Sequence, residues 1–406
     1  MNQTLLLLRF PMLRSSICVF VAVFLAAGCA RSSDAPDTSR AGCIENFDPT
    51  RDYFPDKTQL EFAKHFSIEY HNSYKLVIVR RLADGGLVEK YVLLQCGAPR
   101  PELAGDLSKA PVISVPIKSL FSASSTHLPL LVELGHVDVL TGIAQVSYIT
   151  TKPVLERIRQ GHVTEYAANN VIDTEKVILN APSIVMSSGG FPEAYSLLQK
   201  TGIAVVTNVE WQESSALARA EWIKFMAAFL NEERKARDQF DAVRERYSVF
   251  KERASRIPEK QRPRVMTGLV YRGTFDIAGG ASYVAQLISD AGGVYVWADN
   301  NASGGTTVDL ESQIARASDS DFWINGGDWM SLKAMLAEEP RYRQFKPFVR
   351  GNVWLYNRLV SDNGGYDYWS RGITRPDLIL GDLIKIFHPE LAADHEFVWY
   401  KQVPRE

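Results

Sequence analysis

The chain has 406 residues, of which 46% are hydrophobic, and it carries a formal net charge of −2. A single hydrophobic core rarely grows beyond about 250 to 300 residues, so we expect two domains or two lobes. The balanced charge provides no basic excess of the kind that phosphate binding requires, and we expect no nucleic-acid partner.

The first residues predict an export signal. Arg9 and Arg14 precede an apolar run from Ile17 to Gly28, which is too short to span a bilayer. We assign residues 1–28 to a signal peptide. The run ends in LAAGC, which resembles the lipobox of bacterial lipoproteins, in which Cys29 becomes the lipidated first residue of the mature chain. An ordinary secretory signal cleaved nearby is the alternative.

The next segments predict a tether and a small extension. Residues 29–42 are polar and have too little apolar surface to pack, which predicts a flexible tether. Residues 43–110 contain two strand-like stretches, YKLVIVRR and VEKYVLLQCG, which predict a β-hairpin in an N-terminal extension. Disulfides persist outside the cytoplasm. Cys43 and Cys96 therefore either pair or remain as two buried free thiols.

An internal repeat defines the rest of the chain. Residues 173–190 and 309–327 share the frame Asp-x-Glu-x-x-Ile-x-x-Ala. In each copy an Asp is expected to cap a short helix that has an acid in its first turn, and an apolar strand follows and ends at Gly-Gly.

The segments upstream of the repeat also correspond. LPLLVELGHVDVLTGI and YVAQLISDAGGVYVWAD each predict a helix, a glycine stop and a strand. The strands PVISVPI and RVMTGLVY precede them. The order strand, loop, helix, strand, helix, strand therefore occurs twice. It predicts two α/β lobes, residues 111–230 and 258–406, each with a mainly parallel sheet.

Two helices are expected between the lobes. SSALARAEWIKFMAAFL predicts an amphipathic helix. Its apolar positions are Leu217, Trp222, Phe225, Met226 and Phe229. Residues 231–257 predict a charged helix that stops before Pro258 and would be about 35 Å long, enough to connect the lobes. A coiled-coil interaction arm is the alternative for this second helix.

Two stretches carry a family resemblance. GGYDYWSRGITRPDLILGDLIKIFHPEL contains the motifs Tyr-x-Tyr-Trp, Arg-Pro-Asp and Phe-His-Pro-Glu, and VYRGTFDIAGGASYVAQLISDAGG opens the second lobe. With the two-lobe order, they resemble the solute-binding lipoproteins of ABC importers for ferric siderophores and cobalamin, over about Pro111 to Pro389. The resemblance implies two Rossmann-like lobes joined by a long helix, with a ligand cleft between them. It also implies an anchored extracytoplasmic binding protein without cofactor or catalytic activity.

The resemblance further implies contact with an ABC permease dimer. In this family one Glu on each lobe docks into the permease, and by position in the repeat these residues are Glu175 and Glu311. The alternative is that each acid only interacts with its helix macrodipole and has no partner.

Candidate ligand-binding residues follow the rule that α/β sheets bind ligands at the carboxyl ends of their strands. They are Ser122, Thr126, His127, Gln145, Tyr148, Tyr271, Arg272, Trp329, Asn357, Arg358, Tyr366, Trp369 and Arg371. We expect Trp369 to offer a flat apolar surface and Arg371 to bind carboxylate or catecholate oxygens of an iron chelate. The alternative is that Trp369 fills the core of its lobe and Arg371 pairs with Asp367 or Asp377.

Competing functions have weaker support in the sequence. The seven histidines are scattered, so we predict no site for a bare metal ion. The chain lacks Gly-x-Ser-x-Gly, His-Glu-x-x-His and the glycine-rich phosphate loop, which leaves an exported hydrolase without a motif. Haem or a corrinoid is the alternative to a ferric siderophore as the ligand.

Overall fold

The computed structural model describes five segments of the chain, which are residues 43–81, 86–168, 171–189, 192–271 and 274–406. The predicted signal peptide, Cys29 and the tether lie outside the described residues. Within the described segments, no helix has both the length and the apolarity needed to cross a membrane.

The N-terminal extension forms a four-stranded sheet. Its strands, in spatial order, are β1 (Phe66–Tyr70), β2 (Tyr74–Arg81), β3 (Leu87–Gln95) and β4 (Val112–Val115). β2 and β3 pair antiparallel, as the sequence predicted. β4, which we had expected in the first lobe, instead pairs parallel with β3, because Ile113 and Val115 pack into the core shared with that strand. Cys43 and Cys96 form a disulfide beside β3.

The first lobe has a fully parallel sheet flanked by helices. Its elements are β5 (Leu120–Ser122), α1 (Leu128–Glu133), β6 (Leu140–Ile143), α2 (Lys152–Arg159), β7 (Thr164–Glu165), the hairpin β8 (Ala167–Ala168) and β9 (Val171–Ile172), α3 (Thr174–Asn180), β10 (Ile184–Ser187), α4 (Pro192–Lys200) and β11 (Val205–Thr207). The strand order is β11-β10-β5-β6-β7, so the order reverses between β5 and β10.

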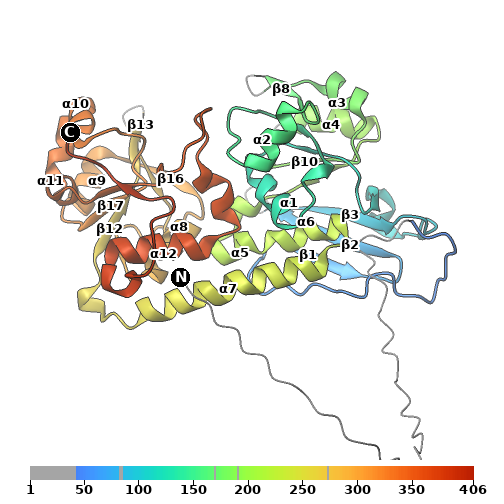
Figure 1. The fold of residues 1–406 in the computed structure, drawn as a ribbon, viewed down its shortest axis with the longest axis horizontal. Coiled ribbons are helices and arrows are strands. Elements are labelled where there is room, and N and C mark those ends of the chain that lie inside the picture. Colours follow the sequence, from blue (N-terminus) through green and yellow to red (C-terminus); the bar gives the residue numbers. More distant parts are fainter. Residues whose placement is uncertain (1–42, 82–85, 169–170, 190–191, 272–273) are drawn as a thin grey trace, which may run out of the picture. The chain divides into compact units, whose positions relative to one another are not determined.

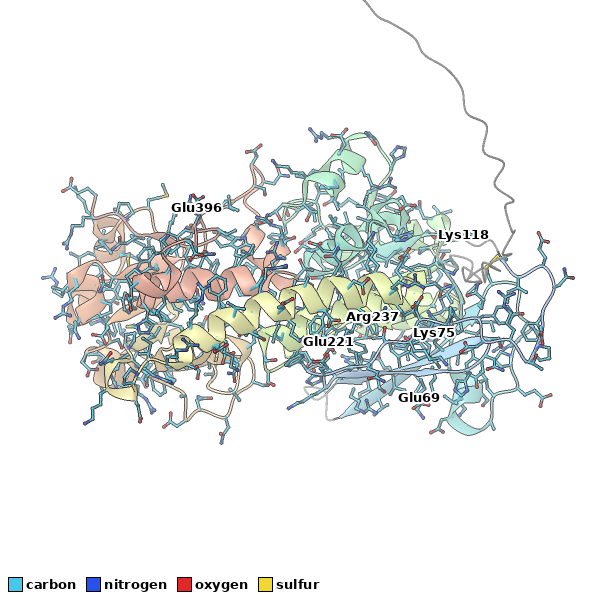
Figure 2. The ribbon with its side chains drawn as sticks, turned by 60° about the horizontal axis from the view of Figure 1, so that its bottom comes forward. Glu69, Lys75, Lys118, Glu221, Arg237 and Glu396 are labelled. Carbon is cyan, nitrogen blue, oxygen red and sulfur yellow. A yellow bond between two sulfur atoms is a disulfide. The ribbon has the colours of Figure 1, made fainter. Side chains whose placement is uncertain are left out.

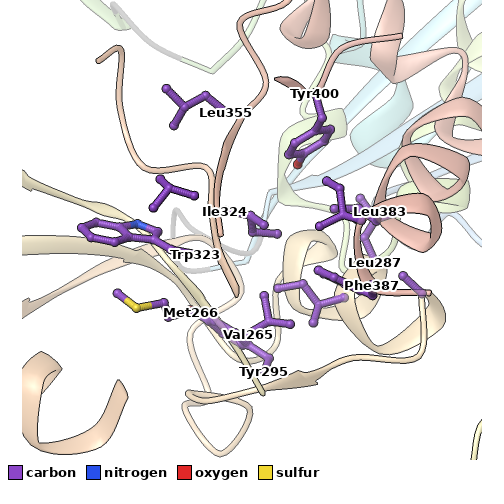
Figure 3. Close-up of a cluster of buried hydrophobic side chains, with 14 of the residues drawn as sticks. Val265, Met266, Leu287, Tyr295, Trp323, Ile324, Leu355, Leu383, Phe387 and Tyr400 are labelled. Atoms are coloured by element: carbon purple, nitrogen blue, oxygen red, sulfur yellow. The ribbon is translucent and has the colours of Figure 1, made fainter. Parts of the chain in front are cut away.

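The second lobe repeats this plan. Its main sheet has the order β15-β12-β17-β18-β19, in which only β19 is antiparallel, and the order reverses between β12 and β17. The elements are β12 (Arg264–Thr267), α8 (Tyr283–Asp290), β15 (Val294–Tyr295), α9 (Leu310–Ala317), β17 (Phe322–Ile324), α10 (Leu332–Glu338), α11 (Lys346–Arg350), β18 (Val353–Leu355), α12 (Pro376–Phe387) and β19 (Lys401–Gln402). Figure 3 shows its core, in which Met266, Trp323 and Phe387 are buried.

One expected strand of this lobe is divided in two. RVMTGLVY forms β12 and then β13 (Leu269–Tyr271), which belongs to a separate antiparallel sheet with β14 (Thr274–Ala278) and β16 (Gly305–Asp309). The break falls at Gly268, whose φ of +102° is open to glycine but strained for other residues. A side chain there would also meet the backbone oxygen of Asp276.

The repeat predicted from the sequence is present. Asp173 caps α3 by accepting the backbone N–H of Lys176 at 2.9 Å, and Asp309 caps α9 by accepting that of Ser312 at 2.7 Å. A parallel strand follows each helix. These features confirm the prediction of two α/β lobes with mainly parallel sheets.

The helices between the lobes are α5 (Ala216–Ala220), α6 (Trp222–Leu230) and α7 (Glu233–Ser255), and α7 lies alongside α6 and α12 (Figure 1). The expected amphipathic character was wrong, because every residue of α6 is buried. The extension covers one side of α6, where the rings of Phe66 and Trp222 lie 4.7 Å apart, and α7 packs on another. α7 therefore packs within the fold and does not project as a coiled-coil arm.

Buried charges fasten the extension to these helices. The ammonium group of Lys75 donates to the backbone oxygen of Ala228 at 2.7 Å and pairs with Glu233. The carboxylate of Glu221 accepts backbone N–H groups from residues 61–63. Lys75 and Glu221 both lie where the extension meets the helices (Figure 2). The extension is thus an integral part of the fold.

Candidate ligand-binding site

A cavity opens where both main sheets reverse their strand order. Ser124 follows β5 and Ser188 follows β10 in the first lobe, whereas Thr267 ends β12 and Asn325 follows β17 in the second. All four residues line one cavity of about 860 Å³. Ligands of open α/β sheets bind at such reversal points, and the volume is within the range of about 300–1,000 Å³ for small-molecule sites.

Aromatic rings face this cavity from both lobes. Trp211 of the first lobe is 45% exposed and Trp369 of the second is 37% exposed, and both line the cavity. The indole nitrogen of Trp211 donates to the backbone oxygen of Ser188 at 3.1 Å, which orients the ring. Trp369 meets the lining ring of Tyr356 edge to face, with centroids 5.3 Å apart. The cavity therefore offers two oriented, partly uncovered apolar surfaces.

A buried ion pair forms another part of the wall. The guanidinium of Arg219 lies 2.8 Å from the carboxylate of Glu210 and 4.2 Å from the centroid of the Tyr283 ring. Burial alone would lower the pKa of Arg219, but the neighbouring Glu210 carboxylate raises it, and the net shift is upward. Because Arg219 and Glu210 both line the cavity, together they present a neutral pair to a ligand.

Two further charged residues line the cavity. Asp276 comes from β14, and among the described residues its carboxylate has no hydrogen-bond or ion-pair partner. Arg81 is the last residue of β2 and so belongs to the extension. The charged groups of the wall therefore come from the extension and from both lobes.

Only some of the predicted ligand residues lie at the cavity. Thr126 and Trp369 line the cavity. Tyr271 ends β13, and Arg272 lies outside the described residues. Gln145 and Tyr148 line a separate pocket of about 70 Å³. The ligand roles of these residues remain predictions.

Several predicted residues are occupied in packing. His127 is 1% exposed and its Nδ1 lies 2.9 Å from the hydroxyl of Ser122, and burial lowers the pKa of His127 to about 3. Trp329 packs against Trp323 and donates from its indole nitrogen to Glu338 at 2.6 Å. None of these three predicted residues, Ser122, His127 and Trp329, is among the residues that line the cavity.

The remaining predicted residues lie near the C-terminal aromatic loop or β18. Asn357 is buried and donates to Asp328, and Arg358 is exposed. Tyr366 packs edge to face on Tyr356. Burial, and to a smaller extent the nearby carboxylate of Asp328, raises the pKa of Tyr366 to about 12. This geometry does not bring Asn357, Arg358 or Tyr366 to the cavity wall.

Arg371 is engaged in the alternative that the sequence left open. Its guanidinium lies 2.8 Å from the carboxylate of Asp367, and both residues line a different space of about 610 Å³. Asp377 pairs instead with Arg375 and Arg246. Arg371 does not line the larger cavity, and its contact with a chelate stays a prediction.

Sequence reasoning missed Trp211, Arg81 and Asp276. Trp211 follows β11 closely, so the same strand-end rule would have found it. Arg81 gives no comparable signal, because it lies in the extension, outside the two-lobe repeat. Asp276 lies inside a strand that the sequence did not predict as a separate element.

Within the described segments, no group of three or more His, Cys, Asp or Glu side chains is arranged to hold a metal ion. The site is therefore built from aromatic rings, hydroxyl groups and a few charges.

Comparisons with known proteins identify a family and a related sequence. The sequence model of the family described as periplasmic binding protein matches residues 121–352. An uncharacterized lipoprotein of Methanocaldococcus jannaschii is 26% identical over 319 residues, which are 74% of this chain and 73% of that protein.

Solved structures show the same fold. A possible iron-binding (periplasmic solute-binding) protein from Staphylococcus epidermidis has a TM-score of 0.53 at 15% identity, covering 67% of this chain and 99% of that one. A periplasmic heme binding protein from Pseudomonas aeruginosa has a TM-score of 0.53 at 16% identity, covering 71% and 99%. Since the family match spans more than half of the sequence, this chain belongs to the periplasmic binding protein family.

Proposed function

We propose that this protein is the extracytoplasmic solute-binding component of an ABC importer and that it captures an iron complex of an organic chelator between its lobes. The observation that carries the proposal is that Trp211 and Trp369 expose indole surface to one cavity from opposite lobes. A ligand that displaced water from these rings would gain the free energy of burying their apolar faces.

The chemistry of the wall supports a chelate as the ligand. Aromatic rings and hydroxyl groups bind organic ligand surfaces, and the iron would keep the ligands of its own chelator. The Arg219–Glu210 pair adds no net charge to this wall. Haem or a corrinoid, whose flat faces also suit the two indoles, is the alternative ligand for the same mechanism.

The named relatives support the same ligand class. One similar structure is that of a possible iron-binding protein, and another is that of a periplasmic heme binding protein. The family is one of binding proteins, and an exported hydrolase has no positive support.

Delivery to the permease would use one acid on each lobe. Glu175 and Glu311 are both exposed, and each is the second residue of its helix, α3 or α9. Glu311 also lies 3.0 Å from the guanidinium of Arg341. This ion pair is exposed to solvent and therefore weak, so an arginine of the permease could take the place of Arg341. Lipid on Cys29 would hold the protein at the membrane, and the mass of the mature amino terminus from the native host tests this anchor.

Tryptophan emission tests the ligand proposal. Haemin, cyanocobalamin, an uncharged ferric trihydroxamate and an anionic ferric tricatecholate are titrated into the purified protein. We expect saturable one-to-one quenching by at least one of them, and weaker binding of that probe by Trp211→Ala and Trp369→Ala.

The control variant is Leu179→Ala, because Leu179 is 85% exposed and does not line the cavity. We expect it to bind like the parent. Binding by none of the four probes, or equal binding by all three variants and the parent, would contradict the proposal.

A further inference from the structure

We propose that the N-terminal extension forms part of the wall of the ligand site and that its Arg81 binds an anionic oxygen of the ligand. The inference rests on the proposed function and adds the chemical group of the ligand that the extension recognises. The family match begins at residue 121, so the extension lies outside it. Nothing in the two-lobe plan therefore accounts for a cavity residue from this sheet.

Arg81 reaches the cavity from the end of a hairpin. It is the last residue of β2 and pairs with Leu87, the first residue of β3. Its guanidinium donates to the backbone oxygen of Gly189, another lining residue, at 3.0 Å. Gly189 has a φ of +93°, and a Cβ there would lie 3.5 Å from the guanidinium nitrogen. The extension and the exit of β10 thus form one continuous wall.

A chain of hydrogen bonds holds this guanidinium in position. Glu89 of β3 accepts from Arg81 at 3.1 Å and also accepts the hydroxyl of Tyr91 at 2.5 Å. The same hydroxyl accepts the backbone N–H of Thr207, the last residue of β11, at 3.0 Å. Burial raises the pKa of Tyr91, which keeps this hydroxyl protonated and able to donate. A guanidinium fixed in this way loses little conformational entropy when it binds a ligand.

The two arginines of the wall differ in where their partners lie. Glu210 lines the cavity beside Arg219, so a ligand meets both charges. Arg81 lines the cavity, whereas Glu89, with which it pairs, does not. Arginine is well suited to carboxylate, phenolate or phosphate oxygens because its planar group offers several N–H donors in fixed directions.

The experiment compares Arg81→Gln with Arg80→Gln. The control removes the same charge one residue away, where Arg80 is exposed and bonds to Ser67 on the sheet surface. Haemin presents carboxylates, an anionic ferric tricatecholate presents phenolate oxygens, and an uncharged ferric trihydroxamate presents neither. We expect Arg81→Gln to weaken binding of an anionic probe by about tenfold or more and to leave the uncharged probe within about twofold. Arg80→Gln should change neither.

The outcomes separate this inference from the proposed function. The loss of haemin binding alone would identify carboxylate as the partner of Arg81, and the loss of tricatecholate binding alone would identify phenolate. Anionic-probe affinity within about twofold of the parent in Arg81→Gln would overturn the inference and leave the proposed function intact. So would equal weakening of charged and uncharged probes, or binding of the uncharged probe alone by the parent. Failure of every probe on the parent would contradict both.

A variant that retains the positive charge guards against a folding artefact. Arg81→Lys keeps the charge but loses the planar set of donors. We expect a parent-like melting temperature and intermediate affinity for the anionic probe. Parent-like affinity in Arg81→Lys together with a full loss in Arg81→Gln would still support a charge contact, whereas equal affinity in all three proteins would not.

Discussion

Replacing Glu221 by Gln should destabilise the protein strongly, although the two side chains have nearly the same shape. One carboxylate oxygen of Glu221 accepts the backbone N–H of Glu61 at 2.9 Å and the ammonium group of Lys224 at 2.8 Å. The other accepts the N–H groups of Phe62 and Ala63, both at 2.7 Å. Glu221 is fully buried and Lys224 is 2% exposed.

The amide of Gln can serve only one of these two oxygen positions. If its oxygen keeps the bonds to Phe62 and Ala63, its NH₂ group faces the N–H of Glu61 and the ammonium of Lys224, which are also donors. Breaking a buried ion pair by removing one partner costs about 3–5 kcal/mol, because the remaining charge stays buried without compensation. We expect a loss of that size in the free energy of unfolding.

Urea denaturation followed by circular dichroism measures this loss from the shift of the midpoint at equal slopes. Glu311→Gln is the matched control, because it makes the same chemical change in a pair whose carboxylate is 75% exposed. We expect the control to change the free energy of unfolding by about 0–1 kcal/mol. Adding Lys224→Met to Glu221→Gln should recover part of the loss, since it removes the uncompensated charge. A loss below about 1 kcal/mol in Glu221→Gln would refute the reasoning.

Three further predictions concern other parts of the molecule. Glu175→Gln combined with Glu311→Gln should abolish uptake in cells and leave ligand affinity in solution unchanged, and normal uptake would refute permease docking by these acids. Trp369→Ala should lower ligand affinity. It should reduce the free energy of unfolding by less than the roughly 3–5 kcal/mol typical of a buried tryptophan, because the side chain is 37% exposed. A larger loss of stability with unchanged affinity would show that Trp369 belongs to the core. His127 has a folded pKa of about 3 against an ordinary value of 6.5, so the unfolded chain binds this proton first as the pH falls. The stability that neutral His127 contributes is therefore complete above about pH 6.5 and is lost toward about pH 3. Across this window the free energy of unfolding should fall more steeply with falling pH in the parent than in His127→Gln. Parallel curves of this free energy against pH would contradict the prediction.

Local signals made much of the fold predictable. The capping residues Asp173 and Asp309 and the glycine stop at Gly135 act within a few residues of the chain, and each is present in the structure. Their order along the chain sets the order of strands and helices, and a parallel sheet follows from that alternation.

Tertiary context decided the features that the sequence did not reveal. α6 reads as amphipathic, yet it is buried on all sides because a sheet far away in sequence covers it. Arg371 has an acid four residues before it, so its pair with Asp367 was one of two interpretations that spacing alone left open. Arg81 becomes a cavity residue only because the extension packs beside Gly189, which no local pattern indicates.

The central claim is that the cavity between Trp211 and Trp369 captures an iron chelate. Native mass spectrometry of the protein purified from iron-limited cells of its own host tests it most directly, with the absorbance spectrum of the released ligand to identify the metal complex. We predict a one-to-one non-covalent adduct that contains iron and is absent from the Trp211→Ala, Trp369→Ala double variant, which should otherwise remain folded. An adduct of the same mass that persists in the double variant, or a bound ligand that contains no metal, would contradict the claim.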